Sequence, residues 1–225
     1  MGPAMTLLEE RRAKLERMRL YLITGDRGDE AETVRIVEAA LAGGVSVVQL
    51  RKKTMPLGEQ YDMALALRRL THIHEALLII NDHADLAIAA DADGVHLGQD
   101  DLPPEVVRAL PGFKDRLIGR STHSRTQAQT AVDEGADYFA VGPVYATPTK
   151  AGRPAVGTTL VSDVAAIADR PFVAVGGLDP ENAPAVIEAG ARAIAVVRAI
   201  YDAPEPAEAA RRLHELMATR LEVLP

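Results

Sequence analysis

The chain has 225 residues, of which 48% are hydrophobic and only 4% aromatic, and its formal net charge is −7. This length suits a single α/β barrel, which typically needs about 200–250 residues. The acidic balance, together with the lack of any basic run longer than three residues, argues against nucleic-acid binding. Because the chain contains no cysteine, disulfides, thiolate metal sites and a cysteine nucleophile are excluded.

The beginning of the chain alternates acidic and basic side chains and lacks the apolar core of a signal peptide. We interpret residues 1–18 as a short N-terminal helical extension, followed by a barrel over residues 19–225. No apolar stretch reaches the roughly 18 residues that a membrane span needs. The sequence therefore predicts a cytoplasmic protein with no membrane partner, and leaves open whether it forms a homo-oligomer.

Short apolar segments alternate along the chain with segments whose apolar residues recur at helical spacing. Most of the apolar segments are nearly continuous in Val, Ile, Leu and Ala, which is typical of parallel strands buried on both faces. In chain order these eight segments are Arg19–Thr24, Val45–Arg51, Ala76–Asp82, Gly94–Gly98, Arg116–Thr122, Asp137–Val144, Pro171–Gly177 and Arg192–Ala199. Their alternation with helices predicts right-handed βαβ units and an α/β fold, a single-domain (β/α)8 TIM barrel.

A weak internal repeat favours a closed barrel over an open sheet. Glycine follows Ala42, Ala92, Glu134 and Glu188 within two residues, between a predicted helix and a predicted strand. Glycine is preferred at the left-handed position that ends a helix, and its recurrence before every second strand is expected of a fourfold-related barrel. An open doubly wound sheet is the alternative, but no G-x-G-x-x-G follows the first strand.

The active site of such a barrel lies at the carboxyl ends of the strands. At the second strand, Gln49, Arg51 and Lys53 alternate in sequence and share one side if the strand continues that far. Gln49 is expected inside the barrel mouth. A guanidinium and an ammonium together suit an anion, although a solvated basic edge is the alternative.

Polar residues also end the third and fourth strands. Asn81 and Asp82 end the third, His96 is expected to point to the barrel axis from the fourth, and Asp100 and Asp101 follow it. Carboxylates from neighbouring strand ends suggest a hard cation such as Mg²⁺, which prefers one or two carboxylates with water and phosphate oxygens. Each pair has an alternative as a helix cap, and we expect either Asp100 or Asp101 to cap the next helix.

The fifth and sixth strands are followed by hydroxyl side chains. Ser121 ends the fifth strand, as a ligand contact or only as the cap of the next helix. Thr147, Thr149 and Lys150 lie in the Gly- and Pro-rich segment 142–157, which has the composition of a loop that closes over a substrate. A disordered surface loop is the alternative.

The last two strand ends suggest a phosphate site. Gly176 and Gly177 end the seventh strand, and Val197 and Arg198 lie near the end of the eighth. Loops at these positions often bind phosphate through backbone N–H groups, and a glycine lets the backbone approach the ligand closely. Because many unrelated barrels share this feature, it indicates a phosphorylated ligand and no particular reaction.

Taken in order, these segments resemble thiamine-phosphate synthase. The matching motifs extend from the second strand to the eighth: Q-x-R-x-K at Gln49–Lys53, N-D at Asn81–Asp82, G-V-H-L-G-Q-D-D at Gly94–Asp101, S-T-H at Ser121, G-A-D-Y at Gly135, G-P-V-Y-x-T-x-T-K at Gly142–Lys150 and G-G at Gly176. Each short motif is weak alone, but the ordered set is specific.

The resemblance implies a transferase that joins an aminopyrimidine diphosphate to a thiazole phosphate and releases diphosphate. It assigns Mg²⁺ to Asp82 and Asp101. It assigns the leaving diphosphate to Arg51, Lys53, Asn81, Ser121 and Lys150, and the pyrimidine to Gln49 and His96. It assigns the thiazole phosphate to Thr147, Thr149, Gly177, Val197 and Arg198.

One residue departs from the family pattern, which usually has Ser where this chain has Arg198. A contact from the backbone N–H survives this change, whereas a contact from a hydroxyl does not. Two rival functions share the barrel and the phosphate site: a thiazole tautomerase and a non-catalytic phosphate-ligand-binding barrel. Neither needs the cations and carboxylates that this chain retains.

Overall fold

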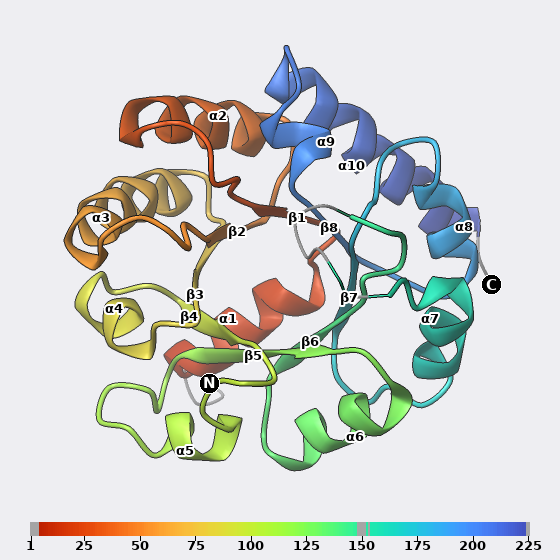
Figure 1. Ribbon diagram of the computed structural model, residues 1–225, viewed down its shortest axis with the longest axis horizontal. Coiled ribbons are helices and arrows are strands. Elements are labelled where there is room, and N and C mark those ends of the chain that lie inside the picture. Colours follow the sequence, from red (N-terminus) through yellow and green to blue (C-terminus); the bar gives the residue numbers. More distant parts are fainter. Residues whose placement is uncertain (1–4, 148–151, 153, 224–225) are drawn as a thin grey trace.

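The computed structural model describes residues 5–147, 152 and 154–223, and it is a closed barrel of parallel strands in sequential order (Figure 1). Each strand pairs in parallel with the next, and the last pairs with the first. The strands are β1 Leu20–Ile23, β2 Val47–Leu50, β3 Leu77–Asn81, β4 Gly94–Leu97, β5 Leu117–Thr122, β6 Tyr138–Val141, β7 Phe172–Val175 and β8 Ile194–Val196. The predicted (β/α)8 barrel is therefore confirmed.

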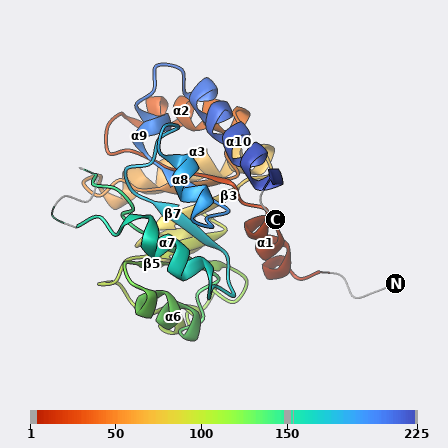
Figure 2. The same cartoon turned by 90° about the vertical axis from the view of Figure 1, so that its right-hand side faces the viewer.

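Helices surround the barrel, and α1 lies across one of its ends (Figures 1 and 2). The helices are α1 Leu7–Glu16, α2 Glu30–Ala42, α3 Leu57–Ile73, α4 Ala84–Ala89, α5 Pro104–Arg108, α6 Arg125–Asp133, α7 Gly157–Ala165, α8 Ala183–Glu188, α9 Arg198–Tyr201 and α10 Pro206–Val223. Within the described ranges, no helix has the length and apolar character needed to cross a membrane.

The period of two along each strand separates two apolar layers. Outward-facing residues such as Leu22, Val48 and Ile80 pack under the helices. Inward-facing residues such as Val47 and Val173 fill the barrel, and Leu15 of α1 belongs to this inner cluster. The barrel is thus closed from below by α1 and filled in its lower part by apolar side chains.

The glycine repeat expected before every second strand holds at three of its four positions, because Gly44 (φ 104°), Gly135 (φ 83°) and Gly190 (φ 102°) precede β2, β6 and β8 in the left-handed region. The exception is the junction before β4. Gly94 is the first residue of β4 rather than a helix end, and a Cβ there would lie 2.3 Å from the Leu117 carbonyl oxygen. The left-handed conformation before β3 and β4 is taken instead by Glu75 (φ 55°) and Asp91 (φ 49°). The prediction was therefore wrong only before β4, where a non-glycine residue, Asp91, ends the helix in this conformation.

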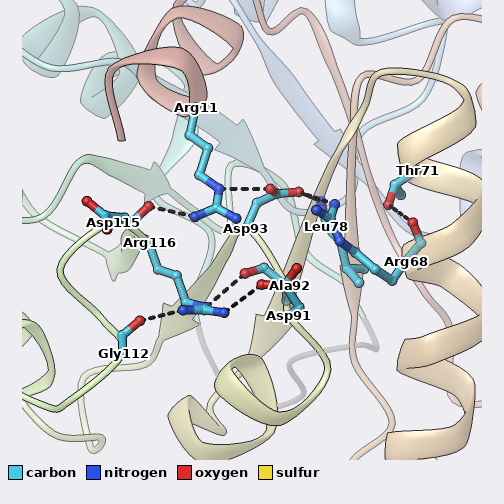
Figure 3. Close-up of polar contacts among 10 residues, drawn as sticks. All are labelled: Arg11, Arg68, Thr71, Leu78, Asp91, Ala92, Asp93, Gly112, Asp115 and Arg116. Atoms are coloured by element: carbon cyan, nitrogen blue, oxygen red, sulfur yellow. Dashed lines mark hydrogen bonds and ion pairs between the residues drawn. The ribbon is translucent and has the colours of Figure 1, made fainter. Parts of the chain in front are cut away.

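Two clusters of charged residues join α1 to the floor of the barrel, and we call them the floor clusters. In the first, the Asp93 carboxylate accepts from Arg11 Nε at 2.9 Å, Arg68 Nη1 at 3.1 Å and the Leu78 backbone N–H at 2.9 Å (Figure 3). Both Arg11 and Asp93 are buried.

The second floor cluster has the same arrangement around Asp137. Its carboxylate accepts from Arg12 Nη2 at 2.6 Å, Arg108 Nη2 at 2.5 Å and the Ile118 backbone N–H at 2.8 Å. Consecutive arginines of α1 thus bind carboxylates that directly precede β4 and β6. This arrangement fixes α1 to the amino ends of the strands.

Candidate active site

A cavity of about 310 Å³ opens at the carboxyl ends of the strands. Its lower wall is apolar, formed by small inward residues such as Ala140, Val173 and Ala195. Its remaining wall contains most of the residues that the sequence singles out: Gln49, Arg51, Asn81, His96, Ser121, Thr147, Gly177, Val197 and Arg198. Side chains and backbone from all parts of the chain therefore meet at one place.

A chain of hydrogen bonds between side chains crosses the interior of the barrel. Gln49 Nε2 donates to Tyr21 Oη at 2.8 Å, and the Tyr21 and Tyr138 hydroxyls lie 3.0 Å apart. His96 joins this chain to β5, with Nδ1 3.2 Å from Tyr138 Oη and Nε2 3.0 Å from Ser121 Oγ. All five side chains are buried, and their hydrogen bonds to one another pair polar atoms that have little contact with bulk water.

Glycine makes this crossing possible. Gly119 of β5 lies between His96 of β4 and Tyr138 of β6 in the strand register. A Cβ on Gly119 would lie 2.2 Å from Tyr138 Cζ, so only glycine leaves room for this ring. The Tyr138 hydroxyl therefore passes over β5 and reaches His96.

Burial keeps both tyrosines protonated. It is the largest cause that raises the pKa of Tyr21 above its ordinary value, and it raises the pKa of Tyr138 well above that value. Two neutral hydroxyls, each able to donate one hydrogen bond, thus stand between Gln49 and His96.

The basic segment after β2 does not continue as a strand. Because β2 ends at Leu50, the alternation expected through Lys53 is wrong, and each side chain takes a separate direction. Arg51 is buried and lines the cavity, with Nη1 3.2 Å from Asp26 Oδ2. Lys53 is exposed, with Nζ 3.6 Å from Asp82 Oδ2.

Lys52, to which sequence analysis assigned no role, is the buried lysine of this segment. Its ammonium donates to the carbonyl oxygen of Arg27 at 2.6 Å and to Tyr201 Oη at 3.1 Å. Burial lowers the pKa of Lys52. Its contacts fasten the segment that follows β1 to the segment that follows β2.

The carboxyl groups of Asp82 and Asp101 lie within interaction distance of each other beside Asn81. Burial, followed by the charge of Asp101, raises the pKa of Asp82, and Lys53 opposes this rise. Asp101 Oδ2 also accepts from the Gly98 backbone N–H at 2.5 Å. The two carboxylates suit a hard cation whose coordination is completed by water and phosphate oxygens. Within the described ranges, no group of three or more His, Cys, Asp or Glu residues is arranged to hold a metal.

The expected helix caps are absent at these positions. α5 begins after Pro103 without a side-chain cap, so the cap expected from Asp100 or Asp101 is wrong. α4 likewise begins after His83 without a side-chain cap, which removes that alternative for Asn81 and Asp82.

Ser121 is not a helix cap either. The cap of α6 is Ser124, whose hydroxyl accepts from the Gln127 backbone N–H. Ser121 lies within β5, and its hydroxyl is hydrogen-bonded to His96.

The opposite rim of the cavity is formed by the ends of β7 and β8. Gly177 has a φ of 65°, and a Cβ there would lie 2.9 Å from the Ala146 carbonyl oxygen. α9 begins after Val197, so the backbone N–H groups of its first turn have no partner within the helix. Thr147 lines the cavity beside this rim, whereas Thr149 and Lys150 lie outside the described residues.

Sequence reasoning missed Tyr21 and Tyr138. A signal was present, because each is a tyrosine in an otherwise apolar strand, at a position that faces the same side as Ile23 or Ala140. Tyr138 also belongs to the G-A-D-Y motif. The contacts that give both residues a role link β1, β6 and β4 across the barrel, which no local pattern records.

Comparison with known proteins gives one family. The family model described as thiamine monophosphate synthase matches residues 20–200. The thiamine-phosphate synthase of Gloeobacter violaceus is 53% identical over 195 residues, which cover 87% of this chain and 56% of that relative, so the chain spans about half of its length. That of Mycolicibacterium vanbaalenii is 45% identical over 215 residues, with 91% and 96% covered. A solved structure, the thiamine phosphate pyrophosphorylase from Pyrococcus furiosus, matches with a TM-score of 0.83 at 33% identity, covering 93% of this chain and 98% of that one.

Proposed function

The chain belongs to the thiamine monophosphate synthase family, and we propose that it is a transferase that condenses hydroxymethyl-aminopyrimidine diphosphate with thiazole ethyl phosphate. The products are thiamine phosphate and diphosphate. The observation that carries the proposal is a single cavity with Arg51 at one rim and a glycine-lined loop before a helix N-terminus at the other. Such a cavity suits two anionic substrates that meet over an apolar floor.

The diphosphate belongs at the rim formed by β2, β3 and β5. Arg51 offers a planar fork of donors and Lys53 a point charge, and both suit phosphate oxygens. The Asn81 amide on β3 and the Ser121 hydroxyl on β5, two strands separated by β4, add neutral donors. Lys150, which lies outside the described residues, is assigned to the same group by the family motif.

The aminopyrimidine belongs deeper in the cavity, near Gln49 and His96. Gln49 Nε2 donates to Tyr21, so its Oε1 is the atom that accepts from the exocyclic amine of the ring. His96 offers its flat ring face beside the pyrimidine. This position brings the reactive methylene carbon toward the centre of the cavity.

The thiazole phosphate belongs at the rim formed by β7 and β8. The backbone N–H groups of Gly177, Val197 and Arg198 and the hydroxyls of Thr147 and Thr149 are its proposed donors. Arg198 replaces the serine usual in the family, and we assign its guanidinium to the same phosphate because it lines the cavity.

Mg²⁺ is the proposed cofactor, held by Asp82 and Asp101. The donor set fits, because two adjacent carboxylates stand beside Lys53 and Asn81, where diphosphate oxygens complete the coordination. Bound Mg²⁺ supplies charge neutralisation to the diphosphate. A cytoplasmic location and the state of assembly remain predictions.

The reaction needs positioning and charge neutralisation more than a base. The bond between the methylene carbon and the diphosphate oxygen breaks, and its electron pair leaves with the diphosphate. Arg51, Lys53 and Ser121 stabilise the charge that grows there. The thiazole nitrogen then donates its lone pair to the methylene carbon, and the new C–N bond completes thiamine phosphate.

The test is the release of diphosphate by the purified chain with both substrates and Mg²⁺. We expect release only when both substrates are present, and its loss after metal removal with excess EDTA, with recovery on adding Mg²⁺. A thiazole tautomerase would isomerise its thiazole substrate without releasing diphosphate. A non-catalytic barrel would bind the thiazole phosphate and turn over neither substrate, and either result would refute the proposal.

A further inference from the structure

The buried hydrogen-bond chain across the barrel has a direction. It begins at Gln49 Nε2, which can only donate, so Tyr21 Oη accepts there. Each tyrosine has one proton, and the Tyr21 hydroxyl has Tyr138 Oη as its other partner among the described residues. Tyr21 therefore donates to Tyr138, and Tyr138 donates to His96 Nδ1.

The same argument assigns the donor and the acceptor in the rest of the hydrogen-bond chain, from His96 to Ser121. Because Nδ1 accepts, the proton of the neutral imidazole is on Nε2, which then donates to Ser121 Oγ at 3.0 Å. The proton of Ser121 is thereby directed away from His96 and toward the cavity that Ser121 lines.

The reverse direction leaves a buried donor without an acceptor. In that case Ser121 donates to Nε2, Nδ1–H donates to Tyr138, and Tyr138 donates to Tyr21. Tyr21 Oη would then accept two hydrogen bonds, and its own proton would have no acceptor within the described ranges. A buried donor without an acceptor is costly, and Tyr21 is only 1% exposed.

We propose that Tyr21 and Tyr138 are positioning residues that hold His96 as its neutral Nε2–H tautomer, so that Ser121 donates its proton into the cavity. Both tyrosines act through His96, and Tyr21 also lines the cavity. The identity of the oxygen that accepts from Ser121, on the leaving diphosphate, rests on the proposed function. The tautomer of His96 does not depend on it.

Nuclear magnetic resonance tests the tautomer directly. With ¹⁵N-labelled histidine, long-range ¹H–¹⁵N spectra of the substrate-free protein at pH 8 distinguish the two tautomers of a neutral ring. The chain has six histidines, and the signal absent in His96→Asn identifies His96. We expect the Nε2–H pattern in the wild type and a mixture of tautomers in Tyr138→Phe, because Nδ1 loses its donor. An Nδ1–H pattern in the wild type overturns the proposal.

Steady-state kinetics test whether the His96 tautomer affects turnover through Ser121. Tyr138→Phe should lower kcat about threefold to tenfold, the scale of one lost hydrogen bond. In a Ser121→Ala background, Tyr138→Phe should have almost no further effect on kcat, because the hydroxyl proton that the hydrogen-bond chain orients is absent. A purely structural role for Tyr138 predicts the same fold-change in both backgrounds. Tyr61→Phe on the exposed face of α3 is the matched control and should leave kcat unchanged.

The two readouts separate two kinds of failure. If the wild type has the Nε2–H tautomer but releases no diphosphate, the donor-to-acceptor direction of the hydrogen-bond chain is supported and the proposed function is refuted. An active enzyme with the opposite tautomer, or with additive effects of Tyr138→Phe and Ser121→Ala, would refute the positioning role and leave the function intact.

Discussion

Charged side chains have more protein partners at the floor of the barrel than at its upper end. At the floor, the carboxylates of Asp93 and Asp137 each accept from two arginines and one backbone N–H. At the upper end, Arg51 has a single ion pair at 3.2 Å with the half-exposed Asp26, and Lys53 is 3.6 Å from Asp82.

This difference separates groups that stabilise the fold from groups that remain available to a ligand. A carboxylate with three protein donors has little capacity for another partner, and losing one of its partners leaves buried charge unpaired. In the proposed function, the cations at the upper end gain most of their interaction energy only when an anion binds. Charged residues at the floor should therefore affect stability, and those at the upper end should affect turnover.

The largest expected effect is at the floor. Asp137→Asn keeps the shape of the side chain but removes the charge between Arg12 and Arg108, so it should lower the free energy of unfolding by about 3–5 kcal/mol. Urea denaturation measures this change. Asp91→Asn is the matched control, because the Asp91 side chain is 72% exposed and its one ion pair among the described residues is with Arg116. This substitution should cost less than about 1 kcal/mol. Equal losses for both variants would contradict the comparison.

At the upper end the expected loss is in turnover. Arg51→Lys should lower kcat by about 10²–10³, because an ammonium cannot reproduce a bidentate contact with phosphate oxygens as charge develops. Arg12→Lys makes the same exchange at the floor and should leave kcat unchanged while it lowers stability. Steady-state kinetics and urea denaturation of both variants decide the matter. A near wild-type kcat for Arg51→Lys would remove Arg51 from the mechanism.

Much of the fold was predictable because it depends on local pattern. Every predicted apolar run contains one strand of the barrel, since strands buried on both faces are nearly continuous in aliphatic residues. The predicted strand ends were too long, because a strand ends where pairing with its neighbours ends. That is how the alternation through Lys53 failed at Leu50.

The site was predictable where chain order alone places residues together. Strand ends meet at one rim of a parallel barrel, so Asn81, His96 and Ser121 were found from order alone. Tyr138 was missed because its role depends on a distance across the barrel and on the absence of a side chain at Gly119. Arg51 and Lys52 are both buried whereas Lys53 is exposed, and this division depends on a turn whose geometry no residue type dictates.

Two glycine substitutions, whose expected effects are of intermediate size, test whether a change near the site affects kcat more than a change elsewhere in the barrel. Gly119→Ala places a Cβ 2.2 Å from Tyr138 Cζ, and Gly94→Ala places one 2.3 Å from the Leu117 carbonyl oxygen. Both should lower the free energy of unfolding by about 1–3 kcal/mol through overpacking. Only Gly119→Ala should also lower kcat, since it displaces Tyr138 from His96. A kcat loss of the same size in both folded variants would show that any distortion of the barrel impairs the site.

The smallest expected effect has the opposite sign to that of Asp137→Asn. Burial and the charge of Asp101 raise the pKa of Asp82 above its ordinary value of 3.8, so the folded protein disfavours the ionised form that is present at pH 7. Between pH 3.8 and the raised value the folded state binds more protons than the unfolded state, so the wild type loses stability as pH rises through this window.

Asp82→Asn removes that charge, and asparagine tolerates the left-handed φ of 63° at this position. The variant should therefore be more stable than the wild type at pH 7 by a few tenths to about 1 kcal/mol, a small gain because the group is partly solvated. The gain should vanish below about pH 4, where the wild-type carboxyl is protonated in both states. Urea denaturation at both pH values measures it. Turnover should fall in the same variant, because a proposed metal ligand is lost. If Asp82→Asn instead destabilises the protein at pH 7, then Asp82 supports the fold as the floor carboxylates do, and the division between the two ends fails at this residue.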